Sequence, residues 1–263
     1  MVITKEDEKL FTEACEKICG KERERKKIGT LSEKTVHAVL KNYLIPVENS
    51  HEIKCGRYVA DIFFEGEITE IQTANFDKLR SKLEVFLKEY DVTIVYPIPA
   101  TKWLLWINEL TGEVTDKRKS PKQGSKYDCF RELYKIKYLL KEPNLHLRLI
   151  LMDVEEYRLL NGWSSDGKKG SVRYDRIPIS LREDIFVNKR EDYSIFIPET
   201  VAEEFTSKEY KAATKLTMRN AQIALNILNY MEVIERKGKR GRSYLYNRKR
   251  KEDIENESSI VEC

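Results

Sequence analysis

Apolar residues recur at helical spacing near the amino terminus. The first apolar stripe has a period of about 3.6 residues and ends at Gly20: Leu10, Phe11, Ala14, Cys15, Ile18 and Cys19. A second stripe begins after Thr30 and ends before Pro46: Leu31, Val36, Val39, Leu40 and Tyr43. Both stripes predict amphipathic helices with one buried side.

Strand-like segments follow these helices. We predict strands at 58–64, 67–73, 92–98 and 103–107, the last two joined by a hairpin across Pro97 and Pro99. Between the second and third strands lies an amphipathic helix whose apolar side carries Phe76, Leu79, Leu83, Phe86 and Leu87. This order of elements predicts an α/β (mixed α+β) fold in layers.

Residues 108–197 show weaker patterns. They predict a basic, turn-rich segment at 117–126, a helix at 127–140, a strand at 147–154, a loop at 162–175 and short strands at 176–180 and 185–188. We place a domain boundary at Pro198. The predicted organisation is a first domain at 1–197, a second at 198–251 and an acidic tail at 252–263.

The segment 58–72 carries two acids that a tight hairpin would bring together. If Glu65 and Gly66 form a two-residue turn, Asp61 faces Glu70 across the strands. Opposed residues have Cβ atoms about 4.5–5.5 Å apart, and like charges there are destabilising. A divalent cation would offset the repulsion, because Mg²⁺ typically binds one or two carboxylates together with water and phosphate oxygens.

Two other arrangements of these acids stay open at this point. A turn of three or four residues would direct one acid to solvent. Alternatively, Arg57 or Lys78 would pair with the acids in place of a metal ion.

The order of these residues resembles the restriction-endonuclease-like superfamily, whose signature is PD-(D/E)XK. The resemblance covers residues 28–107: a helix bearing Glu33, a hairpin with Asp61, then Glu70, one residue and Gln72, and finally an amphipathic helix and a strand. It implies a sheet flanked by helices and a nuclease activity. It also implies that Asp61 and Glu70 bind Mg²⁺ or Mn²⁺, with Glu33 as an accessory ligand.

The sequence departs from the family pattern at two positions. Ala60 stands where the family often has Pro, and Gln72 stands where the catalytic Lys is usual, as in E-x-Q variants of this fold. Gln72 would orient water but cannot act as an acid or a strong base. Lys78 and Lys82, one turn apart on the next helix, would supply the missing positive charge.

Each accessory residue also has a purely structural interpretation. Glu33 fits a capping box that begins at Thr30, in which its side chain returns to the Thr30 backbone. His37, one turn beyond Glu33, fits a partly buried helix histidine as well as a residue that orients water. Lys78 and Lys82 lie opposite the apolar stripe of their helix and fit a solvated face.

The carboxyl-terminal segment 205–251 is strongly basic. It holds thirteen Lys and Arg against three acids, a local charge of +10, although the whole chain has a net charge of only +4. A short helix from Phe205 to Ala213, a longer helix capped by Thr217 and a hairpin with a turn at 238–241 resemble a winged helix-turn-helix. The longer helix would bury Ala221, Ala224, Leu225, Leu228 and Met231.

This basic module predicts DNA as a partner. Four side chains of the longer helix fall away from its apolar stripe and suit base edges: Arg219, Asn220, Gln222 and Asn226. Three cations of the hairpin suit phosphates: Lys239, Arg240 and Arg242. A winged helix used for protein contacts is the alternative.

Composition narrows the functional classes further. No apolar run reaches the roughly 18–20 residues of a membrane span, and the amino terminus lacks the apolar stretch of a secretory signal. The five cysteines show no CxxC spacing, which argues against disulfides and structural zinc. We therefore predict a cytoplasmic protein without a membrane partner. The resemblance to the restriction-endonuclease-like superfamily, together with the basic module, implies a metal-dependent DNA nuclease targeted by its winged helix. The alternative is a DNA-binding regulator with an inactive nuclease-like domain, and a homodimer stays open.

Overall fold

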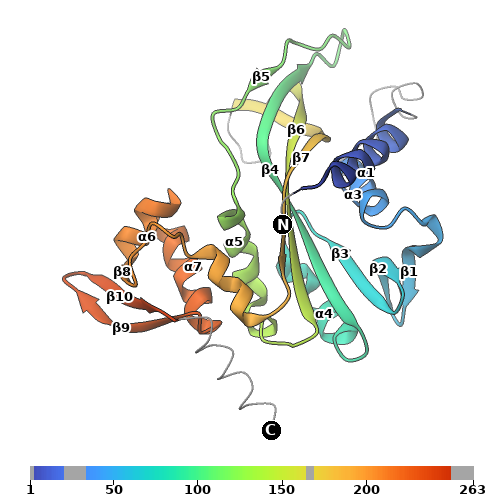
Figure 1. The fold of residues 1–263 in the computed structure, drawn as a ribbon. Coiled ribbons are helices and arrows are strands. Elements are labelled where there is room, and N and C mark those ends of the chain that lie inside the picture. Colours follow the sequence, from blue (N-terminus) through green and yellow to red (C-terminus); the bar gives the residue numbers. More distant parts are fainter. Residues whose placement is uncertain (1–2, 21–33, 164–168, 250–263) are drawn as a thin grey trace. The chain divides into compact units, whose positions relative to one another are not determined.

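The chain has a mixed α/β fold that divides into two compact units (Figure 1). The computed structural model describes residues 3–20, 34–163 and 169–249. The first unit draws on residues up to 73, on 95–125 and on 149–185, and the second on 74–94, on 126–148 and on residues from 186 onward. The domain limits expected at residues 197 and 251 stay predictions.

The larger sheet has seven strands in the order β1-β2-β3-β4-β6-β7, with β5 paired to β4. Its strands are β1 (His51–Cys55), β2 (Tyr58–Phe64), β3 (Glu67–Ile71), β4 (Asp91–Ile107), β5 (Arg118–Lys119), β6 (Leu145–Trp163) and β7 (Lys169–Val187). The pairs β1–β2, β2–β3 and β4–β5 are antiparallel. Strands β4, β6 and β7 are long and contribute residues to both units.

Three expectations about these strands were wrong. The short strands expected at 176–180 and 185–188 belong to the single strand β7, which ends at Val187. Residues 91–107 form the single strand β4, not two strands joined by a hairpin at Pro97 and Pro99. Much of the loop expected at 162–175 is strand, because β6 reaches Trp163 and β7 begins at Lys169. In these places the neighbouring strands supply long-range hydrogen-bonding partners, which override the local turn signals.

Helices α1 (Lys5–Cys15) and α3 (Lys34–Leu44) cover the core of the first unit. A capping box between Thr4 and Asp7 begins α1, and a π-helical turn (Glu16–Gly20) extends it. A 3-10 turn (Glu48–Ser50) leads from α3 to β1. The rings of Phe11 and Tyr43 meet edge to face with centroids 5.4 Å apart. The buried cluster also contains Val36, Val39, Leu40, Ile62, Ile71, Val95, Ile150 and Met152.

The second unit begins with a 3-10 turn (Phe76–Leu79) and helix α4 (Arg80–Phe86). Its predicted apolar stripe is buried at Phe76, Leu79, Leu83 and Phe86. The helix expected at 127–140 is a 3-10 turn (Lys126–Cys129), a short α5 (Phe130–Leu133) and a second 3-10 segment (Tyr134–Leu139). Another 3-10 segment spans Arg190–Phe196.

The carboxyl-terminal module contains two helices and a three-stranded sheet. Its elements are β8 (Glu204–Thr206), α6 (Ser207–Thr214), α7 (Met218–Tyr230), β9 (Ile234–Arg240) and β10 (Ser243–Arg248), with strand order β8-β10-β9. The Thr217 side chain caps α7 by accepting a hydrogen bond from the N–H of Asn220, as predicted. The expected apolar stripe of α7 is buried at all five positions.

The hairpin turn of this module lies further along the chain than the sequence suggested. Arg240 pairs with Ser243, so the turn consists of Gly241 and Arg242. The turn expected at 238–241 was therefore wrong, and Lys239 and Arg240 lie in β9.

No helix among the described residues is long and apolar enough to cross a membrane.

Candidate active site

The β2–β3 hairpin turns through Glu65 and Gly66. Both residues have positive φ angles, 51° and 88°, which is the backbone pattern of a type I′ turn. Phe64 pairs with Glu67 directly beside the turn. The two-residue turn and the register expected from the sequence are confirmed.

Asp61 and Glu70 contact each other's strands beyond the regular ladder. The backbone N–H of Asp61 donates to Glu70 Oε1 at 3.2 Å. The backbone N–H of Ile71 donates to Asp61 Oδ2 at 2.8 Å. Each carboxylate therefore accepts a hydrogen bond from the opposite strand, which holds the two acids together and partly stabilises their charge.

Helix α3 adds a third ionisable group to this pair of acids. His37 Nε2 lies 3.0 Å from Asp61 Oδ2, and the two side chains are 28% and 21% exposed. Glu70 is more buried, with 2% exposure. His37 is thus a partly buried helix histidine, as one interpretation expected. The Arg57 guanidinium lies 5.0 Å from the ring centroid of its neighbour Tyr58.

The other predicted site residues lie elsewhere in the chain or have further contacts. Glu33 lies outside the described residues. The N–H of Gln72 donates to the carbonyl of Val95 at 2.9 Å, which ties the end of β3 to β4. Lys78 and Lys82 belong to the second unit, where the Lys82 ammonium lies 5.6 Å from the centroid of the Phe86 ring. Their catalytic roles stay predictions.

The first unit also holds a group of cations on neighbouring strands that was not predicted from the sequence. Glu156 on β6 has no solvent exposure. Arg158 donates to its Oε1 through Nε at 2.8 Å and through Nη2 at 2.6 Å. Arg176 on β7 donates through Nε to Oε2 at 2.8 Å. Glu156 and Arg158 are two residues apart on one strand, so their side chains are expected on the same face and their pairing could have been predicted. Arg176 is twenty residues away from Glu156, and its pairing could not have been predicted from local sequence.

The cations around Glu156 favour its charged form. Burial opposes ionisation of Glu156, but the charge of Arg176 and the hydrogen bonds from both arginines outweigh it and lower the pKa of the carboxyl. Burial also lowers the pKa of Lys102 on β4, and repulsion by Arg176, Lys122 and Arg158 adds to this effect, against the attraction of Glu156.

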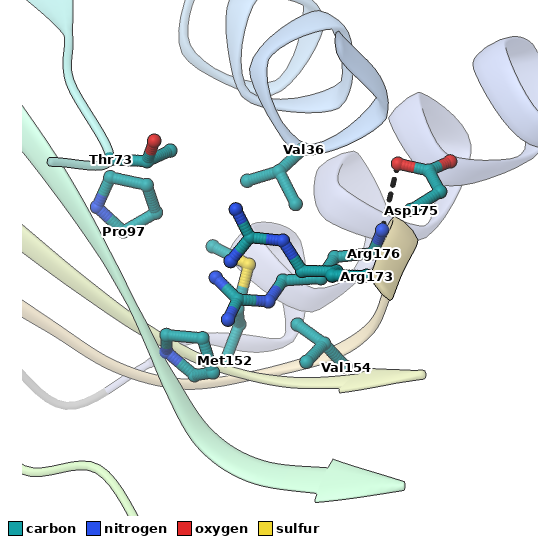
Figure 2. A pocket seen from close by; sticks show the side chains of 9 residues that line it. Val36, Thr73, Pro97, Met152, Val154, Arg173, Asp175 and Arg176 are labelled. Atoms are coloured by element: carbon teal, nitrogen blue, oxygen red, sulfur yellow. Dashed lines mark hydrogen bonds between the residues drawn. The ribbon is translucent and has the colours of Figure 1, made fainter. Parts of the chain in front are cut away.

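A pocket adjoins this group of cations (Figure 2). Its apolar wall consists of Val36, Pro97, Pro99, Met152 and Val154, and its polar residues are Thr73, Arg173, Asp175 and Arg176. Figure 2 shows the side chains of Arg173 and Arg176 extending between Val36 and Met152. We call this the arginine pocket.

Asp175 fixes the strand that carries both pocket arginines. It is 4% exposed. Its Oδ2 accepts a hydrogen bond from the Thr35 hydroxyl at 2.6 Å, and its Oδ1 accepts one from the N–H of Arg176 at 2.7 Å. The first turn of α3 is thereby tied to β7 through Thr35, two residues before His37.

Helix α7 exposes three of the four side chains that were predicted to contact base edges. Arg219, Gln222 and Asn226 are exposed, and Asn220 is half-buried. Asn226 Oδ1 accepts a hydrogen bond from Lys137 Nζ at 2.8 Å. Arg219, Gln222 and Asn226 therefore lie at the surface of α7, and the contact of all four side chains with DNA stays a prediction.

The three predicted phosphate-binding cations of the β9–β10 hairpin have different surroundings. Lys239 Nζ lies 5.4 Å from the ring centroid of Tyr244. The Arg240 guanidinium lies 3.7 Å from Glu204 and 3.8 Å from Glu209. Arg242 is exposed within the turn. Arg240 therefore has acidic neighbours that compete with an external anion.

Comparison with known proteins gives a family without an assigned activity. Residues 34–188, more than half of the chain, match the family described as "Domain of unknown function (DUF8091)". An uncharacterized protein of Treponema pallidum (strain Nichols) is 26% identical over 237 residues, which cover 84% of this chain and 87% of that protein. No solved structure matches the chain.

Proposed function

Since the chain belongs to the family of the domain of unknown function DUF8091, whose description assigns no activity, we propose a function from its residues. The protein hydrolyses phosphodiester bonds of DNA with the help of a divalent cation. In this proposal the first unit is a restriction-endonuclease-like domain and the carboxyl-terminal module is a winged helix that binds DNA. The contact between Asp61 and Glu70 across the β2–β3 hairpin carries the proposal.

The two acids have the chemistry that Mg²⁺ or Mn²⁺ requires. Asp61 and Glu70 offer carboxylate oxygens from adjacent strands, and Asp61 is 21% exposed and so reaches solvent. Among the described residues, no three His, Cys, Asp or Glu side chains form a group that would hold a metal ion. In this proposal Asp61 and Glu70 would bind the ion, with water and substrate phosphate as further ligands, a set that is typical of Mg²⁺.

The metal ion and the residues around the acids would each have a separate role in hydrolysis. A bound cation would act as a Lewis acid on the scissile phosphate and would lower the pKa of an attacking water. The Gln72 amide would orient that water, and His37 would hold the Asp61 carboxylate in position. Because Gln72 is neutral, activity should depend strongly on the metal, with weak turnover in Mg²⁺ and faster turnover in Mn²⁺.

The carboxyl-terminal module supports DNA as the substrate. Helix α7 exposes Arg219, Gln222 and Asn226, which are side chains that bind base edges. Arg242 at the hairpin turn is suited to phosphate. This arrangement would direct the hydrolytic domain to a duplex.

A second candidate function is favoured by the hydrogen bonding of the acids. Asp61 Oδ2 is engaged by both His37 and the N–H of Ile71, and Glu70 is 2% exposed. An acid pair satisfied in this way would also suit a DNA-binding regulator whose nuclease-like domain has no catalytic activity.

Plasmid cleavage separates the two functions. Purified wild-type protein should nick plasmid DNA in Mn²⁺ and more slowly in Mg²⁺, and Asp61→Asn should abolish nicking. The exposed lysine variant Lys88→Ala should cut like the wild type. A protein that binds DNA but cuts neither single-stranded nor duplex DNA with either metal would reject the nuclease and support the regulator.

A further inference from the structure

The arginine pocket and the cations around Glu156 carry more positive than negative charge. Among the described residues, the cations that line the pocket or act on the Glu156 carboxylate are Lys102, Arg158, Arg173 and Arg176, and the acids are Glu156 and Asp175. Four cations against two carboxylates leave two positive charges. All six residues belong to the first unit, so this excess is separate from the basic carboxyl-terminal module.

The strands hold these cations in fixed positions. Lys102, Arg158 and Arg176 lie on β4, β6 and β7, and Glu156 has no exposure. A guanidinium has five N–H donors. Glu156 takes two from Arg158 and one from Arg176, so neither arginine uses all its donors on this acid. The planar fork of arginine matches the oxygens of a phosphate.

The surroundings of Lys102 point to an anionic ligand. Burial lowers the pKa of this lysine, and repulsion from Arg176, Lys122 and Arg158 adds to the effect, although the attraction of Glu156 opposes it. An anion bound between Lys102 and these cations would attract each of them and so offset their mutual repulsion. The apolar wall of the arginine pocket would strengthen the attraction, because charges interact more strongly away from water.

We propose that Arg173, Arg176 and Lys102 form a phosphate-binding site that receives a backbone phosphate of a nucleic-acid strand. The site lies next in the chain to the proposed catalytic residues, since Thr73 follows Gln72 and Val36 precedes His37. Its assignment to a strand rests on the proposed function. The first unit would then bind the substrate through a site of its own, in addition to α7 and the β9–β10 hairpin.

Calorimetric titration of the full chain with inorganic phosphate tests the site without DNA. The wild type should bind phosphate, and Arg173→Ala and Lys102→Met should each bind at least about tenfold more weakly, the loss expected for one charge-assisted contact. Lys102→Met replaces a half-buried cation with an apolar side chain of similar length and should fold normally. Lys54→Ala, an exposed cation on β1, should bind like the wild type. A wild type that binds no phosphate, or variants that bind it equally well, would overturn the site.

Binding of a labelled oligonucleotide at several salt concentrations tests the strand. In Arg173→Ala the slope of log K against log salt should become shallower by about 0.7 for a single strand or about 0.9 for a duplex. A variant that loses phosphate binding but keeps the wild-type slope would overturn the assignment to a strand. Failure of plasmid cleavage leaves both results intact, so the site and the nuclease proposal fail separately.

Discussion

The β2–β3 and β9–β10 hairpins have turns of the same length but hold their charges in opposite surroundings. Each turns through two residues with a glycine at positive φ, Gly66 at 88° and Gly241 at 62°. The first hairpin brings carboxylates together where Glu70 is 2% exposed. The second gathers cations at the surface, where the Arg240 side chain is 54% exposed.

Burial decides how each hairpin stabilises its charges. In the first, backbone N–H groups and His37 bond directly to the acids. In the second, the Arg236 guanidinium lies 4.0 Å from the ring centroid of Tyr244, and Arg240 faces exposed acids, where water and salt weaken the interaction. The buried charges therefore indicate a specific site, whereas the exposed cations indicate a general attraction for polyanions.

The largest loss of stability is expected from removing a fully buried carboxylate of the first unit. Glu156→Ala leaves Arg158 and Arg176 without their shared acid, so the free energy of unfolding should fall by about 3–5 kcal/mol. Urea denaturation at neutral pH measures this change. Glu204→Ala removes an exposed acid beside Arg240 and should change stability by less than about 0.5 kcal/mol. Similar losses in both variants would contradict the contrast between buried and exposed charge.

The pH dependence of unfolding tests the contribution of the Glu156 charge to stability independently. The pKa of folded Glu156 lies below its ordinary value of 4.5, so below that pH the unfolded state binds more protons than the folded state. The stability that Glu156 contributes is present above pH 4.5 and is lost as the pH falls through the folded pKa. Glu156→Gln should therefore show a shallower loss below pH 4.5 than the wild type.

A smaller loss is expected from Glu70. Glu70→Ala removes the carboxylate that accepts from the partly buried N–H of Asp61, which should cost about 1–3 kcal/mol. Glu70→Gln keeps an acceptor oxygen and removes the like charge, so it should cost less. Urea denaturation of both variants measures the difference. Equal losses would mean that the hydrogen bond to Asp61 contributes nothing.

The two turn glycines give a matched pair with a smaller effect. An added Cβ meets no atom within 4 Å at Gly66 or Gly241, so only backbone strain should matter. Gly66→Ala and Gly241→Ala should each lower stability by about 1–2 kcal/mol, with the larger loss at Gly66, whose φ is further from the left-handed minimum. Thermal unfolding tests the order. No loss at Gly66 would contradict the type I′ turn of the β2–β3 hairpin.

The smallest effect is expected from the exposed cations of the β9–β10 hairpin. Arg242→Ala should make the salt dependence of DNA binding shallower by about 0.9 in the slope of log K against log salt. Arg240→Ala should change the slope less, because Glu204 and Glu209 already face this arginine. Fluorescence anisotropy with a labelled duplex measures both slopes. An unchanged slope in Arg242→Ala would leave the hairpin without a phosphate contact.

Local signals made the β2–β3 hairpin and helix α7 predictable from the sequence, whereas the turn of the β9–β10 hairpin was placed too early in the chain. The pair Glu65 and Gly66 specified a two-residue turn, and that turn set the register that brings Asp61 to Glu70. Thr217 and the apolar spacing after it specified α7. Each of these features depends on residues close together in the chain.

The long strands and the second charged group were not predictable in this way. Strand β4 continues through Pro97 and Pro99 because its neighbours pair with it, although both prolines suggest a turn. Arg176 reaches Glu156 across twenty residues of chain, and a segment expected to be a loop carries Arg173. The sequence suggested that His37 would orient a water molecule, but it did not predict the contact between His37 and Asp61. That contact depends on how α3 packs on the hairpin, which is set by the tertiary structure.

Metal binding by the β2–β3 acids is the most direct test of the proposed function, because it depends on neither cleavage nor DNA affinity. Titration calorimetry with Mn²⁺, in the absence of DNA, should show one bound ion per wild-type chain. Asp61→Asn and Glu70→Gln should bind none, and Lys88→Ala should bind like the wild type. A wild-type protein that binds no Mn²⁺, or an Asp61→Asn variant that binds it equally well, would contradict a divalent cation held by Asp61 and Glu70.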